Sequence, residues 1–399
     1  MLLDLLDKEE IWERFFEYKS ALCSSSDEEE LRKFIDEKRY LPVCDTIRSS
    51  GPFALPKRSV LSKLGTSKKR VVYTYPKDEN TVLKLLTYLL IRKYDGLFSK
   101  GLYSFRPNKT AKDAIRGFMR TPGISDMYTY KVDIHDYFNS VPVSRLLPML
   151  EETAEDDQPL LAFLTCLLRE EYVLERGKPI KEQKGIMAGT PLSSFYANLY
   201  LRSLDLRFDT AKIPYARYSD DIIVFAKSEE ETHEYADIIR SHLSRYGLTV
   251  NPSKEQFGSP SDGWTFLGFY VNGKTVDIAP ATVRKLKQKM KRKADSLHRW
   301  AKRTGSDGEQ AAKAFIRIFN KKLLESPVDN ELSWSRWFFP VINTAESLKE
   351  IDAYARQCIR YIITGKHTKS AYNVRYGDMK ALGCRNLVHE YYSFEDKNK

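Results

Sequence analysis

The chain has 399 residues, of which 42% are hydrophobic and 12% aromatic, enough to build two or three packed subdomains and too many for a disordered tail. Its 65 lysines and arginines exceed its 54 acidic residues, and the net charge of +11 favours a polyanionic partner such as nucleic acid, with an ordinary basic surface as the alternative. No apolar run is long enough for a membrane span, and the N-terminus turns acidic too early for a signal peptide. We therefore expect a soluble, cytoplasmic protein, and the five scattered cysteines predict neither a disulfide framework nor a zinc site.

The N-terminal third is predicted to be largely helical. Residues 1–60 form a helical extension, because apolar residues within residues 11–18 recur at helical spacing. A basic, β-branched and aromatic run over residues 68–76 predicts a strand, and a helix is expected over residues 79–95.

The rest of the chain divides into two parts that differ in their pattern of apolar and charged residues. Residues 127–275 alternate short apolar strands with turns and helices, which is typical of a sheet with helices packed on it, and residues 143–185 look like an insertion. Residues 276–399 are predicted to be helical and basic. They begin with a helix over residues 281–303 that has one apolar face and one face of lysines and arginines.

Three aspartates stand where predicted strands end. Asp133 ends an alternating strand over residues 127–134, which places an acid at an open edge, and Asp220 and Asp221 lie at the tip of a predicted hairpin. Because successive strand side chains point to opposite faces, we expect that Asp220 and Asp221 do not face the same point and that Asp220 is the stronger ligand. Clustered carboxylates suit Mg²⁺ or Mn²⁺, and two such ions about 3.5–4 Å apart promote phosphoryl transfer.

Six segments resemble, in order and spacing, the motifs of reverse transcriptases, whereas the Tyr-x-Asp-Asp sequence alone would be a weak signal. These segments are residues 102–109 (the fingers signature of group II intron and related bacterial enzymes), 133–138 (motif A), 185–201 (motif B), 218–221 (motif C), 243–254 (motif D) and 266–269 (the primer-grip motif E). The resemblance implies an α+β right-hand polymerase fold, with fingers at residues 61–126, a palm at 127–275 and a helical thumb from residue 276 onward.

The resemblance also implies the roles of the acidic residues and of a nearby lysine. Asp133 and Asp220 would hold two Mg²⁺ ions, with Asp221 in support and the backbone carbonyl of Ile134 as a further ligand. Lys254 would lie beside the leaving pyrophosphate, with a solvated surface lysine as the alternative.

Further implied contacts concern the nucleotide and the duplex. Phe138, at the position of the steric gate, would exclude a ribose 2′-hydroxyl. The other residues that would contact the nucleotide, or the template beside it, are Arg70, Arg106, Gly189 and Pro191. Those that would position the primer 3′ end are Phe266, Leu267 and Gly268. Those of the basic helix that would contact duplex phosphates are Arg284, Lys287 and Lys291.

The function implied is RNA-directed DNA synthesis, in which deoxynucleoside triphosphates are joined into cDNA on an RNA template. Residues 371–376 and 382–392 resemble the tail of stand-alone, defence-associated bacterial reverse transcriptases of the unknown groups. That likeness suggests a structured noncoding RNA as template and a role in antiphage defence. Two alternatives stay open: a catalytically idle RNA-binding or maturase-like protein, and template-independent or protein-primed DNA synthesis. The sequence leaves the oligomeric state undecided.

Overall fold

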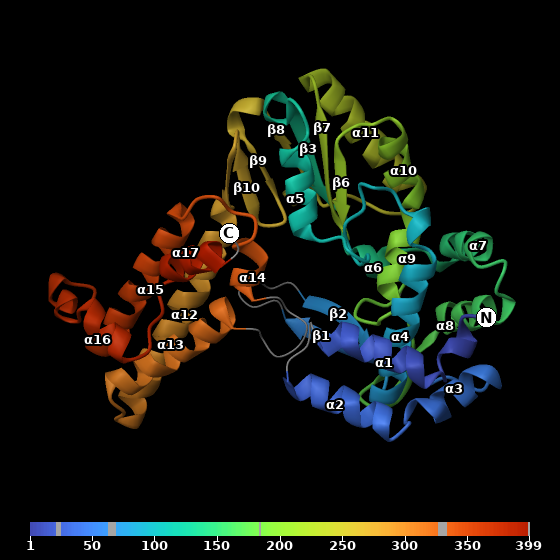
Figure 1. The fold of residues 1–399 in the computed structure, drawn as a ribbon, viewed down its shortest axis with the longest axis horizontal. Helices are drawn as coiled ribbons and strands as arrows, with labels where there is room; N and C mark the ends of the chain where they lie inside the picture. The colour runs from blue at the N-terminus through green and yellow to red at the C-terminus, as the bar shows by residue number, and fades with distance from the viewer. Residues whose placement is uncertain (21–24, 63–68, 183–184, 326–332, 398–399) are drawn as a thin grey trace. The chain divides into compact units, whose positions relative to one another are not determined.

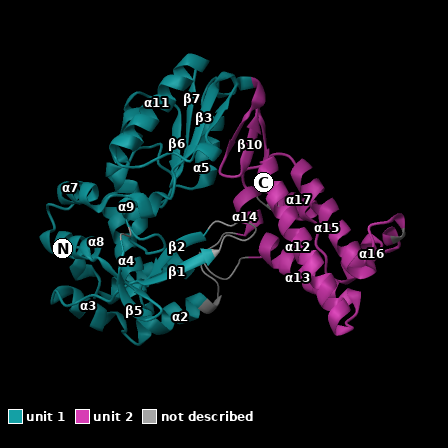
Figure 2. Ribbon diagram, turned by 180° about the vertical axis from the view of Figure 1, so that it is seen from behind, with its two compact units in different colours: residues 1–260 teal, residues 261–399 magenta. Residues whose placement is uncertain are grey.

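The computed structural model describes residues 1–20, 25–62, 69–182, 185–325 and 333–397. The chain separates into two compact units, Met1–Pro260 and Ser261–Lys399 (Figure 2). Helices and antiparallel strands are both present in each unit, so the predicted α+β class is confirmed. Among the described helices, none has the combination of length and apolar character that crossing a membrane requires.

The N-terminal segment of the first unit is helical as far as Arg48, as its apolar spacing predicts, but residues 57–60 of the predicted helical extension belong to a strand. Trp12 is fully buried here, and its ring stacks on Tyr40 at a centroid distance of 4.9 Å. The helices of this region are α1 (Glu9–Ser20), α2 (Ser25–Asp36), α3 (Tyr40–Arg48) and α4 (Lys77–Lys93).

A small sheet with the strand order β2-β1-β4-β5 lies in the same unit (Figure 1). Its strands are β1 (Lys57–Ser62), β2 (Lys69–Thr74), β4 (Tyr172–Glu175) and β5 (Lys178–Lys181). Strand β2 corresponds to the strand predicted at residues 68–76, of which residue 68 lies outside the described residues.

The second sheet of this unit has the order β6-β7-β3-β8, and all of its pairings are antiparallel. Its strands are β3 (Tyr128–Asp133), β6 (Tyr215–Tyr218), β7 (Asp221–Ala226) and β8 (Gln256–Gly258). Strand β3 lies between β7 and β8, and Asp133 is only 6% exposed. The prediction that Asp133 lies at an open edge is therefore wrong, because Asp133 pairs with Asp221 on one side and its carbonyl oxygen accepts from the Asn251 N–H on the other.

Helices cover both faces of this sheet. Phe225 of β7 packs against Phe118 of α5 at a centroid distance of 4.6 Å, whereas Ile222 and Val224, which alternate with it, join the core that contains Ile239 of α11. The remaining helices of the unit lie along the same core. The helices from α5 to α11 are α5 (Ala111–Met119), α6 (Tyr137–Ser140), α7 (Val143–Thr153), α8 (Gln158–Arg169), α9 (Ser193–Tyr200), α10 (Arg202–Thr210) and α11 (Glu229–Arg245).

The second unit combines a three-stranded sheet, ordered β11-β10-β9, with a group of helices. The strands are β9 (Trp264–Phe266), β10 (Phe269–Asn272) and β11 (Thr275–Ile278), and the helices are α12 (Pro280–Thr304), α13 (Gly308–Leu324), α14 (Trp334–Phe338), α15 (Glu346–Thr364), α16 (Tyr376–Ala381) and α17 (Leu387–Lys397). Helix α12 matches the helix predicted over residues 281–303. Its apolar face is buried at Val283, Leu286, Met290 and Ala294, and α12 packs against α13 and α15.

Candidate active site

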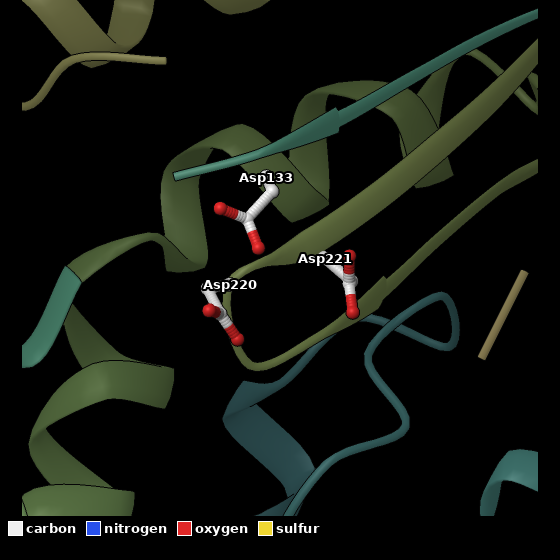
Figure 3. A group of neighbouring side chains, drawn as sticks. All are labelled: Asp133, Asp220 and Asp221. Atoms are coloured by element: carbon white, nitrogen blue, oxygen red, sulfur yellow. The ribbon is translucent and has the colours of Figure 1, made fainter. Parts of the chain in front are cut away.

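Three carboxylates converge where strands β3 and β7 meet (Figure 3). The antiparallel register pairs Asp133 with Asp221, and Asp220 lies in the turn that joins β6 to β7. One oxygen from each of Asp133, Asp220 and Asp221 lies within 4.8 Å of the others. The expectation that Asp220 and Asp221 face different points is wrong, because Asp220 belongs to the turn and strand alternation does not govern its direction.

Burial and neighbouring charges raise the pKa values of Asp220 and Asp221. Burial, and next the charge of Asp220, raises the pKa of Asp221 to about 6. The pKa of Asp220 is also raised, first by burial and then by Asp133, while the charges of Lys254 and Arg70 oppose the increase. A cluster of partly buried, mutually repelling hard oxygen donors fits a divalent cation such as Mg²⁺ or Mn²⁺, which would relieve that repulsion.

Lys254 lies beside this cluster. It ends a 3-10 helix (Pro252–Lys254), and its ammonium forms an ion pair with the carboxylate of Asp133. The backbone positions it, because the Asn251 N–H donates to the carbonyl oxygen of Asp133 at 2.8 Å. The His135 N–H donates to the carbonyl oxygen of Thr249, which lies in the same segment as Asn251 and Lys254, at 2.9 Å. The end of β3 therefore carries the segment that resembles motif D.

Hydrogen bonds fix both backbone polar groups of Ser219, the residue directly before Asp220. Ser219 has a positive φ of 59°, a conformation that needs support in a non-glycine residue. Its N–H donates to the hydroxyl oxygen of Ser104 at 2.9 Å, and its carbonyl oxygen accepts from the guanidinium of Arg217 at 3.2 Å. Ser104 is itself anchored to α9, where the Asn198 amide donates to the Ser104 carbonyl oxygen at 2.9 Å.

Arg217 is fully buried and is paired with a buried carboxylate. Its Nε and Nη2 atoms donate to the two oxygens of Asp205, at 2.8 and 2.6 Å. The hydroxyl of Tyr215 donates to the same carboxylate at 2.8 Å. Sequence reasoning missed this network around Ser219. The available signal was an arginine inside an apolar strand, since a buried guanidinium requires an acidic partner.

The loop that resembles motif B is attached to strand β2. The Tyr73 N–H donates to the carbonyl oxygen of Ala188 at 2.8 Å. Gly189 has a φ of +100°, and a Cβ there would lie 3.0 Å from the Tyr73 carbonyl oxygen, so a glycine is required. Pro191 follows in the same loop and is half-buried. Arg70 is an exposed residue of β2, and its positive charge acts to lower the pKa of Asp220.

Phe138 follows the first of the three aspartates. Its ring is half-buried and packs edge-to-face on Phe105, at a centroid distance of 6.4 Å. The carbonyl oxygen of Phe138 accepts a hydrogen bond from the Ile186 N–H at 2.9 Å, which ties the segments that resemble motifs A and B together.

Arg106 does not lie at the position that the resemblance implies. Its side chain is 7% exposed, its Nε donates to the carboxylate of Asp95 at 2.7 Å, and other guanidinium nitrogens donate to the carbonyl oxygens of Asp95, Ser99 and Leu102. The prediction that Arg106 binds a nucleotide or template is wrong, because these groups occupy the guanidinium and bury it. The arginine instead stiffens the segment that carries Ser104.

The predicted primer-grip residues belong to the second unit. Phe266 is fully buried in β9, and Leu267 and Gly268 form the turn into β10. Both turn residues have positive φ values, 52° and 86°. The indole N–H of Trp337 donates to the Leu267 carbonyl oxygen at 3.2 Å, which fixes this turn.

The basic face of α12 is only partly free. Arg284 and Lys291 are exposed to solvent. The ammonium of Lys287 instead forms an ion pair with Glu350 of α15 at 2.8 Å and lies 4.9 Å from the centroid of the Tyr354 ring. Lys287 is therefore engaged by a neighbouring helix while it stays partly exposed, and its contact with a duplex remains a prediction.

Comparisons with known proteins find one matching family model and several solved structures with a similar fold. A family model described as reverse transcriptase (RNA-dependent DNA polymerase) matches residues 55–271, which is more than half of the chain. The apo telomerase of Candida tropicalis aligns with a TM-score of 0.48 and 13% identity, over 79% of this chain and 59% of that one. A form of it truncated from the C-terminal domain gives 0.45 and 16%, over 57% and 55%.

A further neighbour is the telomerase of Candida albicans in complex with a TWJ fragment of telomeric RNA. It aligns with a TM-score of 0.43 and 13% identity, over 84% of this chain and 66% of that one. The chain thus spans between 55% and 66% of the length of these telomerase chains. No curated protein matches the sequence.

Proposed function

Because this chain belongs to the reverse transcriptase (RNA-dependent DNA polymerase) family, we propose that it synthesises cDNA from deoxynucleoside triphosphates on an RNA template. The observation that carries the proposal is the convergence of Asp133, Asp220 and Asp221 from two paired strands. A cluster of repelling carboxylates is costly to a fold unless it serves a site.

The reaction is the attack of a primer 3′-hydroxyl on the α-phosphate of the incoming nucleotide. A new P–O bond forms, the bond to the β-phosphate breaks, the hydroxyl proton passes to solvent and pyrophosphate leaves. Asp133, Asp220 and Asp221, with the carbonyl of Ile134, would hold two Mg²⁺ or Mn²⁺ ions. When bound, such ions activate the attacking hydroxyl and stabilise the leaving oxygen.

The chain's own side chains orient the substrate. Lys254 presents a proton and a positive charge close to Asp133, where pyrophosphate would leave. Arg70, exposed on β2, would bind triphosphate oxygens. Phe138 would press against the sugar and exclude a 2′-hydroxyl, and the loop with Gly189 and Pro191 would support the nascent base pair.

Residues beyond these would hold the product duplex. Arg284 and Lys291 expose cations for phosphate contacts, and the turn formed by Leu267 and Gly268 would position the primer 3′ end. The resemblance of residues 371–376 and 382–392 to defence-associated bacterial enzymes supports a finer proposal. The enzyme would copy a dedicated, structured noncoding RNA in the bacterial cytoplasm, and its cDNA would serve antiphage defence.

The test is to sequence all nucleic acid that copurifies with the full chain after incubation with Mg²⁺ and deoxynucleotides. The inactive control is Asp220→Asn/Asp221→Asn, and Asp126→Asn, at an exposed acid, is the matched control. DNA complementary to one bound RNA, formed with the wild type and Asp126→Asn only, is the expected result. Bound RNA without DNA in every sample would instead favour the idle RNA-binding protein, and DNA that matches no RNA would favour template-independent synthesis.

A further inference from the structure

Two tyrosines and two arginines form a surface patch in the second unit, outside the residues that the family model matches. Arg356 and Arg360 lie one turn apart on α15. Tyr372 lies in a short 3-10 helix, Lys369–Asn373, and Tyr376 begins α16, which packs beside α15 (Figure 1). These four residues are here called the tyrosine–arginine patch.

The patch consists of two cation–π pairs. The Cζ atom of Arg360 lies 4.5 Å from the ring centroid of Tyr372, and that of Arg356 lies 6.0 Å from the ring centroid of Tyr376. Arg360 is held in place, because its Nε donates to the carbonyl oxygen of Val374 at 3.2 Å. Each tyrosine ring therefore lies beside a guanidinium, and that of Arg360 is fixed by a hydrogen bond.

Both tyrosines remain exposed to solvent. Tyr372 is 60% exposed and Tyr376 is 41% exposed, although each has a guanidinium on one face. An ordinary buried aromatic would have packed both faces, and an exposed aromatic without a partner would lose more side-chain freedom on stacking. These rings are thus pre-ordered platforms for a planar group.

Positive charge surrounds the two platforms. The exposed cations of this segment are Lys366, Lys369, Arg375 and Lys380. Within the described part of the chain, none of the four forms an ion pair. The one acid among them, Asp378, accepts a hydrogen bond from the Arg375 backbone N–H at 2.7 Å. The surface therefore suits a polyanion that carries flat rings.

We propose that the tyrosine–arginine patch binds single-stranded RNA, with successive bases stacked on Tyr372 and Tyr376 and phosphates beside the surrounding cations. Unpaired bases expose the faces that such rings need, whereas the bases of a duplex are already stacked on each other. The choice of RNA over DNA rests on the proposed function, since the single strand that this family copies is RNA. The patch gives the enzyme a hold on its template that is separate from the three aspartates.

The experiment measures binding of the full chain to a fluorescein-labelled oligouridylate of about twelve nucleotides, within the usual size of a single-strand site, by fluorescence anisotropy. Deoxynucleotides and divalent cations are omitted, so the result does not depend on DNA synthesis. We expect Tyr372→Ala/Tyr376→Ala to weaken binding about tenfold or more, since each stacked base contributes about 1–3 kcal/mol. Tyr372→Phe/Tyr376→Phe keeps the ring faces and should bind within about twofold of wild type.

Tyr392→Ala is the matched control, because Tyr392 is a 50% exposed tyrosine of the same unit that lies on α17, outside the patch. An equal loss in Tyr392→Ala, or no loss in the double alanine variant, would overturn the proposal. Oligodeoxythymidylate bound as tightly as RNA would overturn the choice of RNA. Photocrosslinking with 5-iodouridine RNA should label Tyr372 or Tyr376, and labels found only elsewhere would also contradict it. DNA synthesis on a short primer–template, measured separately, distinguishes failure of this proposal from failure of the polymerase function.

Discussion

Arg217 donates a hydrogen bond to the carbonyl oxygen of Ser219 at 3.2 Å, while its Nε and Nη2 atoms donate to the carboxylate of Asp205. A fully buried ion pair is thus used to hold a turn with positive φ directly before Asp220. The polypeptide alone would not favour this turn at a serine, so the direction of the Asp220 carboxylate depends on a contact between α10 and β6.

Replacing Arg217 with methionine should lower the free energy of unfolding by about 3–5 kcal/mol, because the carboxylate of Asp205 is then buried without its partner. The double variant Arg217→Met/Asp205→Leu should recover part of that loss, since no unpaired charge remains. Urea denaturation of these two variants and of the single variant Asp205→Leu measures the coupling. Additive losses in the double variant would show that the pair is not coupled.

Ser104→Ala removes the acceptor for the Ser219 N–H and leaves the ion pair intact. We expect a modest loss of stability, of about 1 kcal/mol, but a larger fall in kcat, of roughly tenfold, because the turn that carries Asp220 loosens. Ser125→Ala, at an exposed serine of the same unit, serves as the control. Primer extension at saturating deoxynucleotide would contradict the prediction if Ser104→Ala and Ser125→Ala gave the same kcat.

The raised pKa of Asp221, about 6, predicts how the stability of the metal-free protein depends on pH. A carboxyl whose pKa is higher in the folded state binds more protons when folded, so stability falls as the pH rises from the unfolded pKa, about 4, through the folded pKa. Added Mg²⁺ should therefore stabilise the protein more above pH 6 than near pH 4. Thermal unfolding across this range tests the sign, and Asp221→Asn should flatten the metal-free profile whereas Asp126→Asn should not.

Phe138→Ala should let ribonucleotides enter more readily, because the half-buried ring would no longer press against the sugar. Sugar selection is measured as the ratio of kcat/KM for a deoxynucleotide to that for the matching ribonucleotide. Phe257→Ala, at an exposed phenylalanine of β8, is the control and should keep the wild-type ratio. An unchanged ratio in a folded Phe138→Ala protein would remove the gate assignment.

The local pattern was enough to predict β2, α4 and α12, since each depends on neighbours within a few residues. It also placed Asp133 at the end of a strand. It could not predict that β8 would cover β3, or that Asp220 would leave the strand pattern, because both depend on pairings between distant segments. For the same reason, the sequence could not show which lysines and arginines are free to bind a ligand and which form an ion pair with a carboxylate from another segment.

Arg70 and Arg106 allow an experimental comparison of an exposed arginine with one that is engaged in an ion pair, since the sequence suggested the same role for both. Arg70 is exposed on β2 and its charge reaches Asp220, so Arg70→Gln should raise the KM for deoxynucleotides several-fold and leave stability within about 0.5 kcal/mol of wild type. Arg106 is buried against Asp95, so Arg106→Gln should lower the free energy of unfolding by about 3 kcal/mol or more, while KM stays close to wild type in the folded fraction. Steady-state kinetics and urea denaturation of the same two preparations decide the matter. A raised KM for Arg106→Gln with unchanged stability would return that arginine to the nucleotide site.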